Sequence, residues 1–145
     1  MFLHTFGDAG GKCWGICSYV RYPIEQKAFA SKLISANSKL SPPKPPLLST
    51  PRRELNAAYL AVEKSTTLAT ILQIPKENVF IHIDSLVVYW WIRTPPELLK
   101  TYVSNRVRKI QNSQFQILFV KGNENPSDLV SKDKPAQKPL SFWLE

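Results

Sequence analysis

Residues 79–85 read VFIHIDS, an apolar run around one histidine that ends in a carboxylate and a hydroxyl. A short apolar run of this kind is typical of a strand buried within a sheet. A helix is predicted before it, beginning at Thr50 and ending before Pro75, because apolar residues recur there at helical spacing. Residues 86–92 predict a second helix directly after it. A buried strand between two helices is the unit of an α/β fold.

The rest of the sequence supplies more strands and helices. Five strands are expected over residues 2–6, 13–20, 27–34, 79–84 and 115–120. Helices are also expected over residues 99–110 and 127–131. The order β-β-β-α-β-α-α-β-α predicts a mixed five-stranded sheet, three antiparallel strands followed by βα units, with helices on both faces.

The length of the chain, 145 residues, predicts one domain. We assign it to residues 1–133, and residues 134–145 to a C-terminal tail. Residues 36–51 contain five prolines, whose missing amide donors predict an extended surface connection. The chain lacks an apolar run of ~18 residues and a signal-like N-terminus, so we expect no membrane span and an intracellular location, in cytoplasm or nucleus.

The charge of the chain favours an anionic partner. Nineteen Lys and Arg against eleven Asp and Glu give a formal net charge of +8, as in many proteins that bind nucleic acid. Few aspartates are present, and most stand at the ends of predicted elements.

The uncharged aromatic residues Trp90 and Trp91 are expected in the core, and His4 and His82 in the core or at a sheet edge.

Four carboxylates stand at ends of elements or on an inward face. They are Asp8, Glu54, Asp84 and Asp128. Each one alone has a simpler interpretation as a turn residue or a helix-terminal carboxylate. Together they suggest a metal site, because buried acids need a cation and oxygen ligands select Mg²⁺ or Mn²⁺. A pair of such ions ~3.5–4 Å apart supports phosphodiester cleavage.

The order of these residues resembles the Asp-Glu-Asp-Asp pattern of the ribonuclease H family. The similarity is greatest to the RNase H domain of BEL/Pao-type LTR retrotransposon polyproteins. The segments that carry it are residues 6–9, 30–32, 50–55, 84–90, 99–107 and 125–132. The resemblance therefore covers almost the whole chain and implies the RNase H-like fold.

The resemblance also implies an activity: hydrolysis of the RNA strand of an RNA/DNA hybrid, with two Mg²⁺ ions, or Mn²⁺, as cofactor. Asp8 would bridge both ions. Glu54 and Asp84 would hold the ion on the leaving-group side, and Asp128 would complete the ion beside the attacking water. In the parent elements a reverse transcriptase domain precedes this domain in the polyprotein and is the expected partner.

A further set of residues is predicted to contact the hybrid. The helix over residues 99–110 carries four cations off its apolar face, which either track phosphates or form an ordinary solvated surface. The predicted nucleic-acid contacts are Gly10, Lys12, Arg53, Ser85, Lys100, Arg106 and Lys109.

Two other functions fit the same residues. A domesticated RNase H-like module would bind nucleic acid or protein with weak or no hydrolysis. Residues 121–125, KGNEN, lack the histidine that cellular and retroviral RNases H usually carry before the last aspartate. A DDE-type transposase or integrase core shares the sheet but needs a last catalytic Glu on a long helix. Glu54 on the first helix and Asp128 after Asn-Pro-Ser argue against that second alternative.

Overall fold

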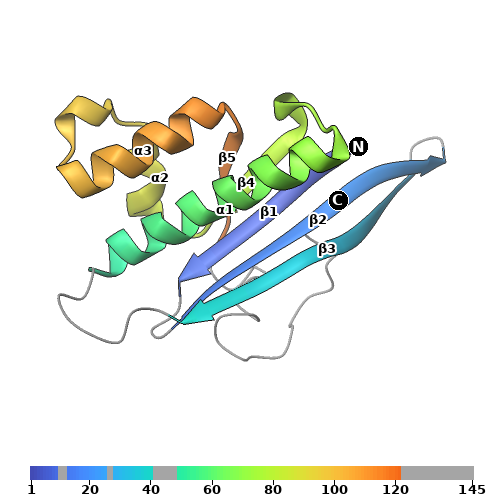
Figure 1. Cartoon of the computed structure of the whole chain (residues 1–145), viewed down its shortest axis with the longest axis horizontal. Coiled ribbons are helices and arrows are strands. Elements are labelled where there is room, and N and C mark those ends of the chain that lie inside the picture. Colours follow the sequence, from blue (N-terminus) through green and yellow to red (C-terminus); the bar gives the residue numbers. More distant parts are fainter. Residues whose placement is uncertain (10–12, 26–27, 41–48, 122–145) are drawn as a thin grey trace.

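The computed structural model of the chain describes residues 1–9, 13–25, 28–40 and 49–121, and every structural statement below refers to them. The strands are β1 (Phe2–Ala9), β2 (Cys13–Glu25), β3 (Ala28–Leu40), β4 (Val79–Ile83) and β5 (Gln116–Phe119). The helices are α1 (Thr50–Leu72), α2 (Leu86–Ile92) and α3 (Thr101–Ser113). Figure 1 shows them beside the twisted sheet. No helix in these ranges is both long and apolar enough to cross a membrane.

The sheet has the order β3-β2-β1-β4-β5, with β1 at its centre. Antiparallel pairing joins β1 to β2 and β2 to β3, whereas β4 lies parallel to both β1 and β5. This is the mixed five-stranded sheet that the sequence predicts. Because β1 and β4 are parallel, their carboxyl ends meet at one edge of the sheet.

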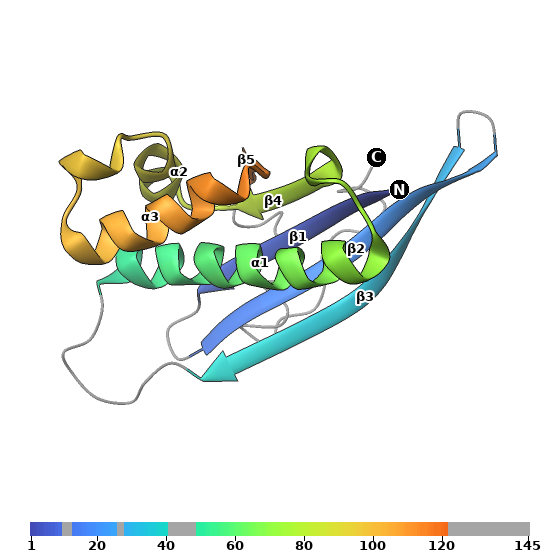
Figure 2. The ribbon, with the colours of Figure 1, turned by 45° about the horizontal axis from the view of Figure 1, so that its top comes forward.

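The main core lies between the sheet and the helices. Helix α1 crosses β1, β2 and β4, and α3 packs beside α1 (Figure 2). Leu3 and Ile81 point from the strands into this layer, where Leu55 of α1 and Val107 of α3 meet them, all with no solvent exposure. The helix expected over residues 127–131 lies outside the described residues. The prediction of helices on both faces of the sheet includes that helix.

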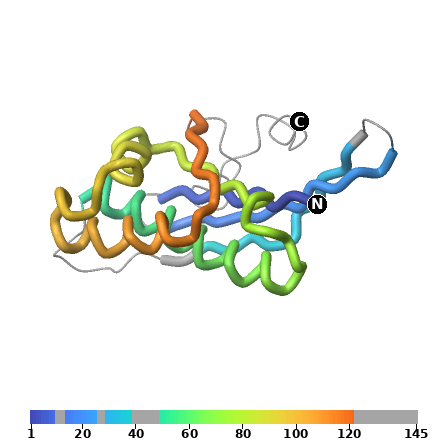
Figure 3. The backbone as a smooth tube through the Cα atoms, turned by 90° about the horizontal axis from the view of Figure 1, so that it is seen from above, coloured from blue at the N-terminus to red at the C-terminus, as the bar shows by residue number. Residues whose placement is uncertain are grey.

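Strand β2 is longer than the sequence predicts. It continues through Pro23 to Glu25, and with β3 it projects past the start of β1 at Phe2 (Figure 3). The last residue of β2 that pairs with β1 is Arg21, opposite Phe2. Beyond Arg21, β3 is the one described strand that lies beside β2. The missing amide of Pro23 therefore loses no hydrogen bond on the other side of β2, where β1 is absent.

Strand β3 also exceeds its predicted length. It runs to Leu40 and so includes residues 36–40, which the sequence assigns to the proline-rich connection. The reason is that the first proline of that segment is Pro42, and the residues before it keep their amide donors. The prolines from Pro42 to Pro46 lie outside the described residues.

The first helix begins with a cap different from the predicted one. The sequence favours Thr50 as the cap, but the hydroxyl oxygen of Ser49 accepts the hydrogen bond from the backbone N–H of Arg52, at 3.4 Å. Pro51 lies in the first turn, as expected. Gln73, in the left-handed conformation with φ of 56°, ends the helix before Pro75.

Candidate active site

Asp8 and Asp84 stand at the edge where β1 and β4 end. The last paired residues of these parallel strands are Phe6 and His82, and each aspartate lies two residues further along its chain. Continuing the register places the two backbones side by side, on strands ~4.8 Å apart. Asp8 is buried, with 5% of its surface exposed, and Asp84 is half-buried. Two carboxylates are therefore concentrated at one edge of the sheet.

Glu54, the third predicted carboxylate, is on α1. It is half-buried in the first turns of the helix, which lies over β1. The described ranges contain no group of three or more His, Cys, Asp or Glu side chains that could hold a metal ion. Asp128 lies outside those ranges. Convergence of all four carboxylates on metal thus stays a prediction.

Gly7 allows α1 to approach β1 closely beside Asp8. A Cβ atom at Gly7 would lie 3.1 Å from the carbonyl oxygen of Ala57 and 3.4 Å from the Cβ of Ala61. The oxygen belongs to the helix backbone, so it moves only if α1 moves. Glu54 lies one turn before Ala57 on the same helix. Any shift of α1 at this contact would therefore also move Glu54 relative to Asp8.

Replacing Gly7 with alanine should therefore affect both stability and activity. We expect Gly7→Ala to lower the free energy of unfolding by ~1–3 kcal/mol, the usual range for an overpacked contact. It should also reduce hybrid cleavage, because α1 shifts with Glu54. Urea unfolding and a cleavage assay measure the two effects, with Ser31→Ala on the exposed surface of β3 as a control. Unchanged stability would show that the contact is not tight in solution.

A buried pair of histidines lies on the face of β1 and β4 that is turned away from α1. The Nδ1 of His4 and the Nε2 of His82 are 2.9 Å apart and share a hydrogen bond. The ring of Phe6 stacks on His82 at 4.2 Å, and Phe80 stacks on His4 at 4.9 Å. Burial, with a smaller contribution from the nearby charge of Arg21, lowers the pKa of His4 to about 4. Burial, with a smaller contribution from His4, lowers the pKa of His82 to about 3. Both rings are neutral at pH 7, in keeping with core histidines.

Two predicted nucleic-acid contacts, Arg106 and Lys109, lie along the seam between α3 and α1. The Arg106 guanidinium stands 3.6 Å from the ring centroid of Tyr102, and that of Arg52 stands 5.3 Å from the same centroid. The ammonium of Lys109 donates a hydrogen bond to the hydroxyl of Tyr59, at 3.3 Å. Cations from two helices are thus gathered on tyrosine rings. Sequence reasoning did not identify this role of Tyr102 and Tyr59.

The other predicted contacts have different surroundings. The Ser85 hydroxyl oxygen accepts a hydrogen bond from the backbone N–H of Val88, at 3.2 Å, and so caps α2. Arg53 is half-buried and donates to the hydroxyl oxygen of Thr50, at 3.3 Å. Lys100 is exposed just before α3. The remaining two, Gly10 and Lys12, lie outside the described residues.

The prediction that Trp90 lies in the core is wrong. Its side chain is 62% exposed, whereas Trp91 packs against the core. Val88 and Ile92, four residues apart, form the buried face of α2. Adjacent helical residues are rotated by ~100° from each other, so only one of the two tryptophans can share that face.

Solved structures with a similar fold are RNase H domains. RNase H1 from the halophilic archaeon Halobacterium salinarum NRC-1 matches with a TM-score of 0.57 at 10% identity, covering 88% of this chain and 91% of that one. The PFV RNase H domain matches with a TM-score of 0.54 at 15% identity, covering 90% and 85%. LC11-RNase H1, solved in complex with an RNA/DNA hybrid, gives 0.50 at 14% identity, covering 86% and 88%. At these identities the likeness shows the fold.

The family is shown by the sequence itself. No curated protein matches the chain significantly. A family model described as the Pao retrotransposon-like RNaseH-like domain matches residues 1–85, more than half of the chain. This segment contains three of the four predicted carboxylates and the parallel strands β1 and β4, near whose ends Asp8 and Asp84 lie. The chain therefore belongs to the Pao retrotransposon-like RNase H-like family.

Proposed function

We propose that the chain is a metal-dependent endoribonuclease that hydrolyses the RNA strand of RNA/DNA hybrids. The observation that carries the proposal is the parallel pairing of β1 with β4, because Asp8 and Asp84 each lie two residues beyond the last pair. Glu54 is proposed to join them from α1, which packs on β1. The family match and a net charge of +8 support a polyanionic substrate. The hybrid held by LC11-RNase H1, a protein of similar fold, supports the same substrate class.

The residues proposed to hold two Mg²⁺ ions are Asp8, Glu54, Asp84 and Asp128. Their donor atoms are all carboxylate oxygens, which fit Mg²⁺ or Mn²⁺ and disfavour softer metals. When bound, such ions activate water and stabilise the charge that develops on the phosphate. Burial of Asp8 excludes water from its carboxylate, which strengthens its attraction for a cation.

The cations along the contact between α1 and α3 are proposed to attract the hybrid. Arg52 and Arg106 share the ring of Tyr102 near the end of α1 that carries Glu54. Holding both side chains against one ring lowers the entropy lost when they contact a phosphate. Contacts of this kind read the backbone of a hybrid and carry no sequence preference.

This electrostatic role predicts a change in salt dependence. Arg106→Ala and Lys109→Ala should each reduce the slope of log affinity against log salt by ~0.7–0.9, the value for one lost phosphate contact. Affinity should fall equally for hybrids of different sequence. Fluorescence anisotropy across a salt series measures both effects, and Lys32→Ala, an exposed cation on β3, is the charge-matched control. Wild-type slopes in both variants would place the substrate elsewhere, nearest to Gly10–Lys12 and the start of α1.

A panel of substrates tests the proposed function. Hybrid, single-stranded RNA, duplex RNA and duplex DNA of one sequence are incubated with the chain, with and without Mg²⁺. We expect cleavage of the RNA strand of the hybrid alone, and only with metal. Hybrid binding without cleavage in both Mg²⁺ and Mn²⁺ would instead support the alternative, a domesticated module that binds without cutting.

A further inference from the structure

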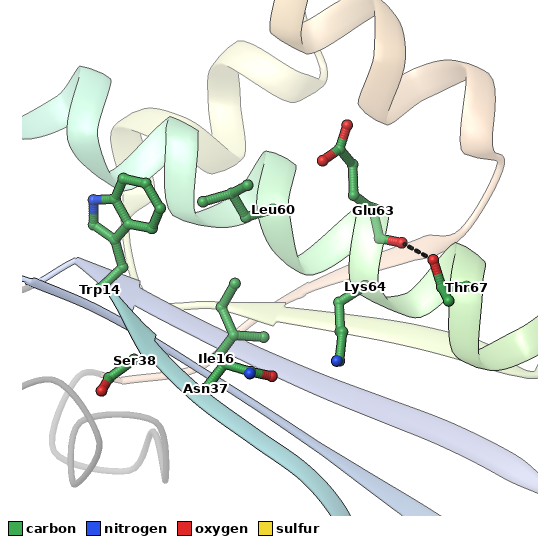
Figure 4. A pocket seen from close by; sticks show the side chains of 8 residues that line it. All are labelled: Trp14, Ile16, Asn37, Ser38, Leu60, Glu63, Lys64 and Thr67. Atoms are coloured by element: carbon green, nitrogen blue, oxygen red, sulfur yellow. Dashed lines mark hydrogen bonds between the residues drawn. The ribbon is translucent and has the colours of Figure 1, made fainter. Parts of the chain in front are cut away.

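A groove of about 280 Å³ opens between α1 and the outer strands β2 and β3 (Figure 4). Its apolar walls are the indole of Trp14 and the side chain of Ile16, both on β2, and Leu60 on α1. The Trp14 ring stands up from the sheet toward Leu60. Trp14 and Leu60 are only half-buried, so a flat apolar surface remains accessible within the groove.

The described residues that line the groove include one cation and one carboxylate. Lys64, the cation, is half-buried and extends from α1 toward the sheet (Figure 4). Glu63, the carboxylate, accepts a hydrogen bond from the Tyr59 hydroxyl and points away from Lys64. Asn37 and Ser38 of β3 add an amide and a hydroxyl. An aromatic face, one cation and neutral hydrogen-bonding groups are the combination that binds an unpaired nucleotide.

The groove begins beside the candidate active site. Trp14 pairs with Ala9, the residue after Asp8. Leu60 is six residues after Glu54, a separation of ~9 Å along a helix at ~1.5 Å per residue. The groove therefore leads away from the carboxylates along α1. Its volume lies at the lower limit of the ~300–1,000 Å³ typical of ligand pockets, which suits a single nucleotide.

We propose that this groove binds the first unpaired nucleotide of a single-stranded extension of the hybrid. The base stacks on Trp14 against Leu60, the adjoining phosphate pairs with Lys64, and Asn37 and Ser38 form hydrogen bonds with the base or sugar. The inference rests on the proposed function, because it requires the duplex to lie at the neighbouring edge of the sheet. A nucleic-acid occupant is favoured because Lys64 extends toward the sheet, where it can pair with a phosphate, whereas the Glu63 carboxylate points away from Lys64.

The test compares hybrids with one common duplex and three kinds of end: blunt, extended by adenosines, or extended by abasic sugar-phosphate. The extension is placed on the RNA or the DNA strand in separate arms, and affinity is measured in EDTA to prevent cleavage. We expect the adenosine extension to tighten binding roughly five- to a hundredfold, the equivalent of ~1–3 kcal/mol for one stacked base. The abasic extension should keep only the smaller gain from its phosphates.

Variants of two lining residues separate stacking from charge. Trp14→Leu should remove the advantage of adenosine over the abasic extension, and Trp14→Phe should keep most of it. Lys64→Gln should weaken both extensions equally, whereas Lys32→Gln on β3 should change neither. Because Trp14 is half-buried, replacing it could destabilise the fold, so the melting temperature of each variant is recorded. If Trp14→Leu fails to fold, Trp14→Phe and Lys64→Gln still test the proposal. Equal affinity for blunt and extended hybrids, or a gain that persists in Trp14→Leu, overturns the proposal.

The same measurements distinguish this inference from the proposed function. If the chain cleaves blunt hybrid but gains nothing from an extension, the groove proposal fails and the nuclease proposal stands. If extensions bind through Trp14 but no hybrid is cut, the nuclease proposal fails and the groove stands. A peptide is the alternative occupant of the groove. If a proline-rich or acidic peptide displaces the extension from the groove and a free oligonucleotide does not, the groove proposal fails in favour of a protein ligand.

Discussion

Asp8→Asn should abolish metal-dependent hydrolysis of the hybrid while raising the melting temperature of the metal-free protein. Asp8 is buried near the end of β1, and Asp84 directly follows β4, where a continued parallel register would bring the two residues side by side. Removing one of two neighbouring negative charges relieves repulsion that metal would otherwise relieve. We expect the cleavage rate to fall about a thousandfold or more, ~4 kcal/mol of transition-state stabilisation, and the melting temperature in EDTA to rise by a few degrees.

The combination of the two effects is what makes this variant informative. A substitution that merely damages the fold lowers activity and the melting temperature together. Glu97→Gln, which removes an exposed carboxylate after α2, is the charge-matched control and should change neither quantity. A melting temperature of Asp8→Asn below that of the wild type would contradict like-charge strain at this edge. Full cleavage activity would remove Asp8 from the metal site.

Stability should fall steeply below pH 6.5 because of His4 and His82. Burial lowers the pKa of each ring in the folded protein, to about 4 and about 3, from an ordinary value of 6.5. Between these limits the unfolded chain binds more protons than the folded one, so lowering the pH favours unfolding. If both rings stay neutral in the fold, the free energy of unfolding should fall by up to ~2.7 kcal/mol per pH unit near pH 5. The contribution of the two rings to the pH dependence fades above pH 6.5 and is nearly gone about one pH unit higher.

A double substitution tests the source of this acid sensitivity. His4→Leu with His82→Leu removes both rings of the hydrogen-bonded pair, so no buried partner is left behind. Its profile of unfolding free energy against pH, from urea titrations between pH 4 and 8 in EDTA, should be much flatter than that of the wild type below pH 6.5. A double variant as acid-sensitive as the wild type would assign the effect to other groups.

Patterns confined to short segments predicted the fold well. The apolar run that forms β4 and the spacing that forms α2 both lie within a few residues, and each was placed within one residue of its observed bounds. The length of the β2–β3 hairpin was not predictable in the same way. Pro23 is tolerated because β1 begins opposite Arg21, so β1 does not extend alongside Pro23, and residues near Pro23 in the sequence do not show this pairing.

The candidate site was predictable where it depends on strand ends. Asp8 and Asp84 follow apolar runs, and the parallel pairing of β1 with β4 is what the α/β pattern implies. Contacts between helices could not be foreseen. The arginines that meet at Tyr102 come from positions fifty-four residues apart, Arg52 and Arg106, and only the packing of α3 against α1 brings them together. Asp128 stays a prediction.

The most direct test of the central claim is single-turnover cleavage of a hybrid whose two strands carry different labels, by the wild type and Asp84→Asn side by side. In Mg²⁺ the wild type should cut the RNA strand and leave the DNA strand intact. Asp84→Asn should bind the hybrid and cut neither strand, because Asp84 is proposed to hold metal together with Asp8 at the point where β1 and β4 end. A wild type that binds the hybrid but cuts nothing in Mg²⁺ or Mn²⁺, or a variant that cuts as fast as the wild type, would contradict the account.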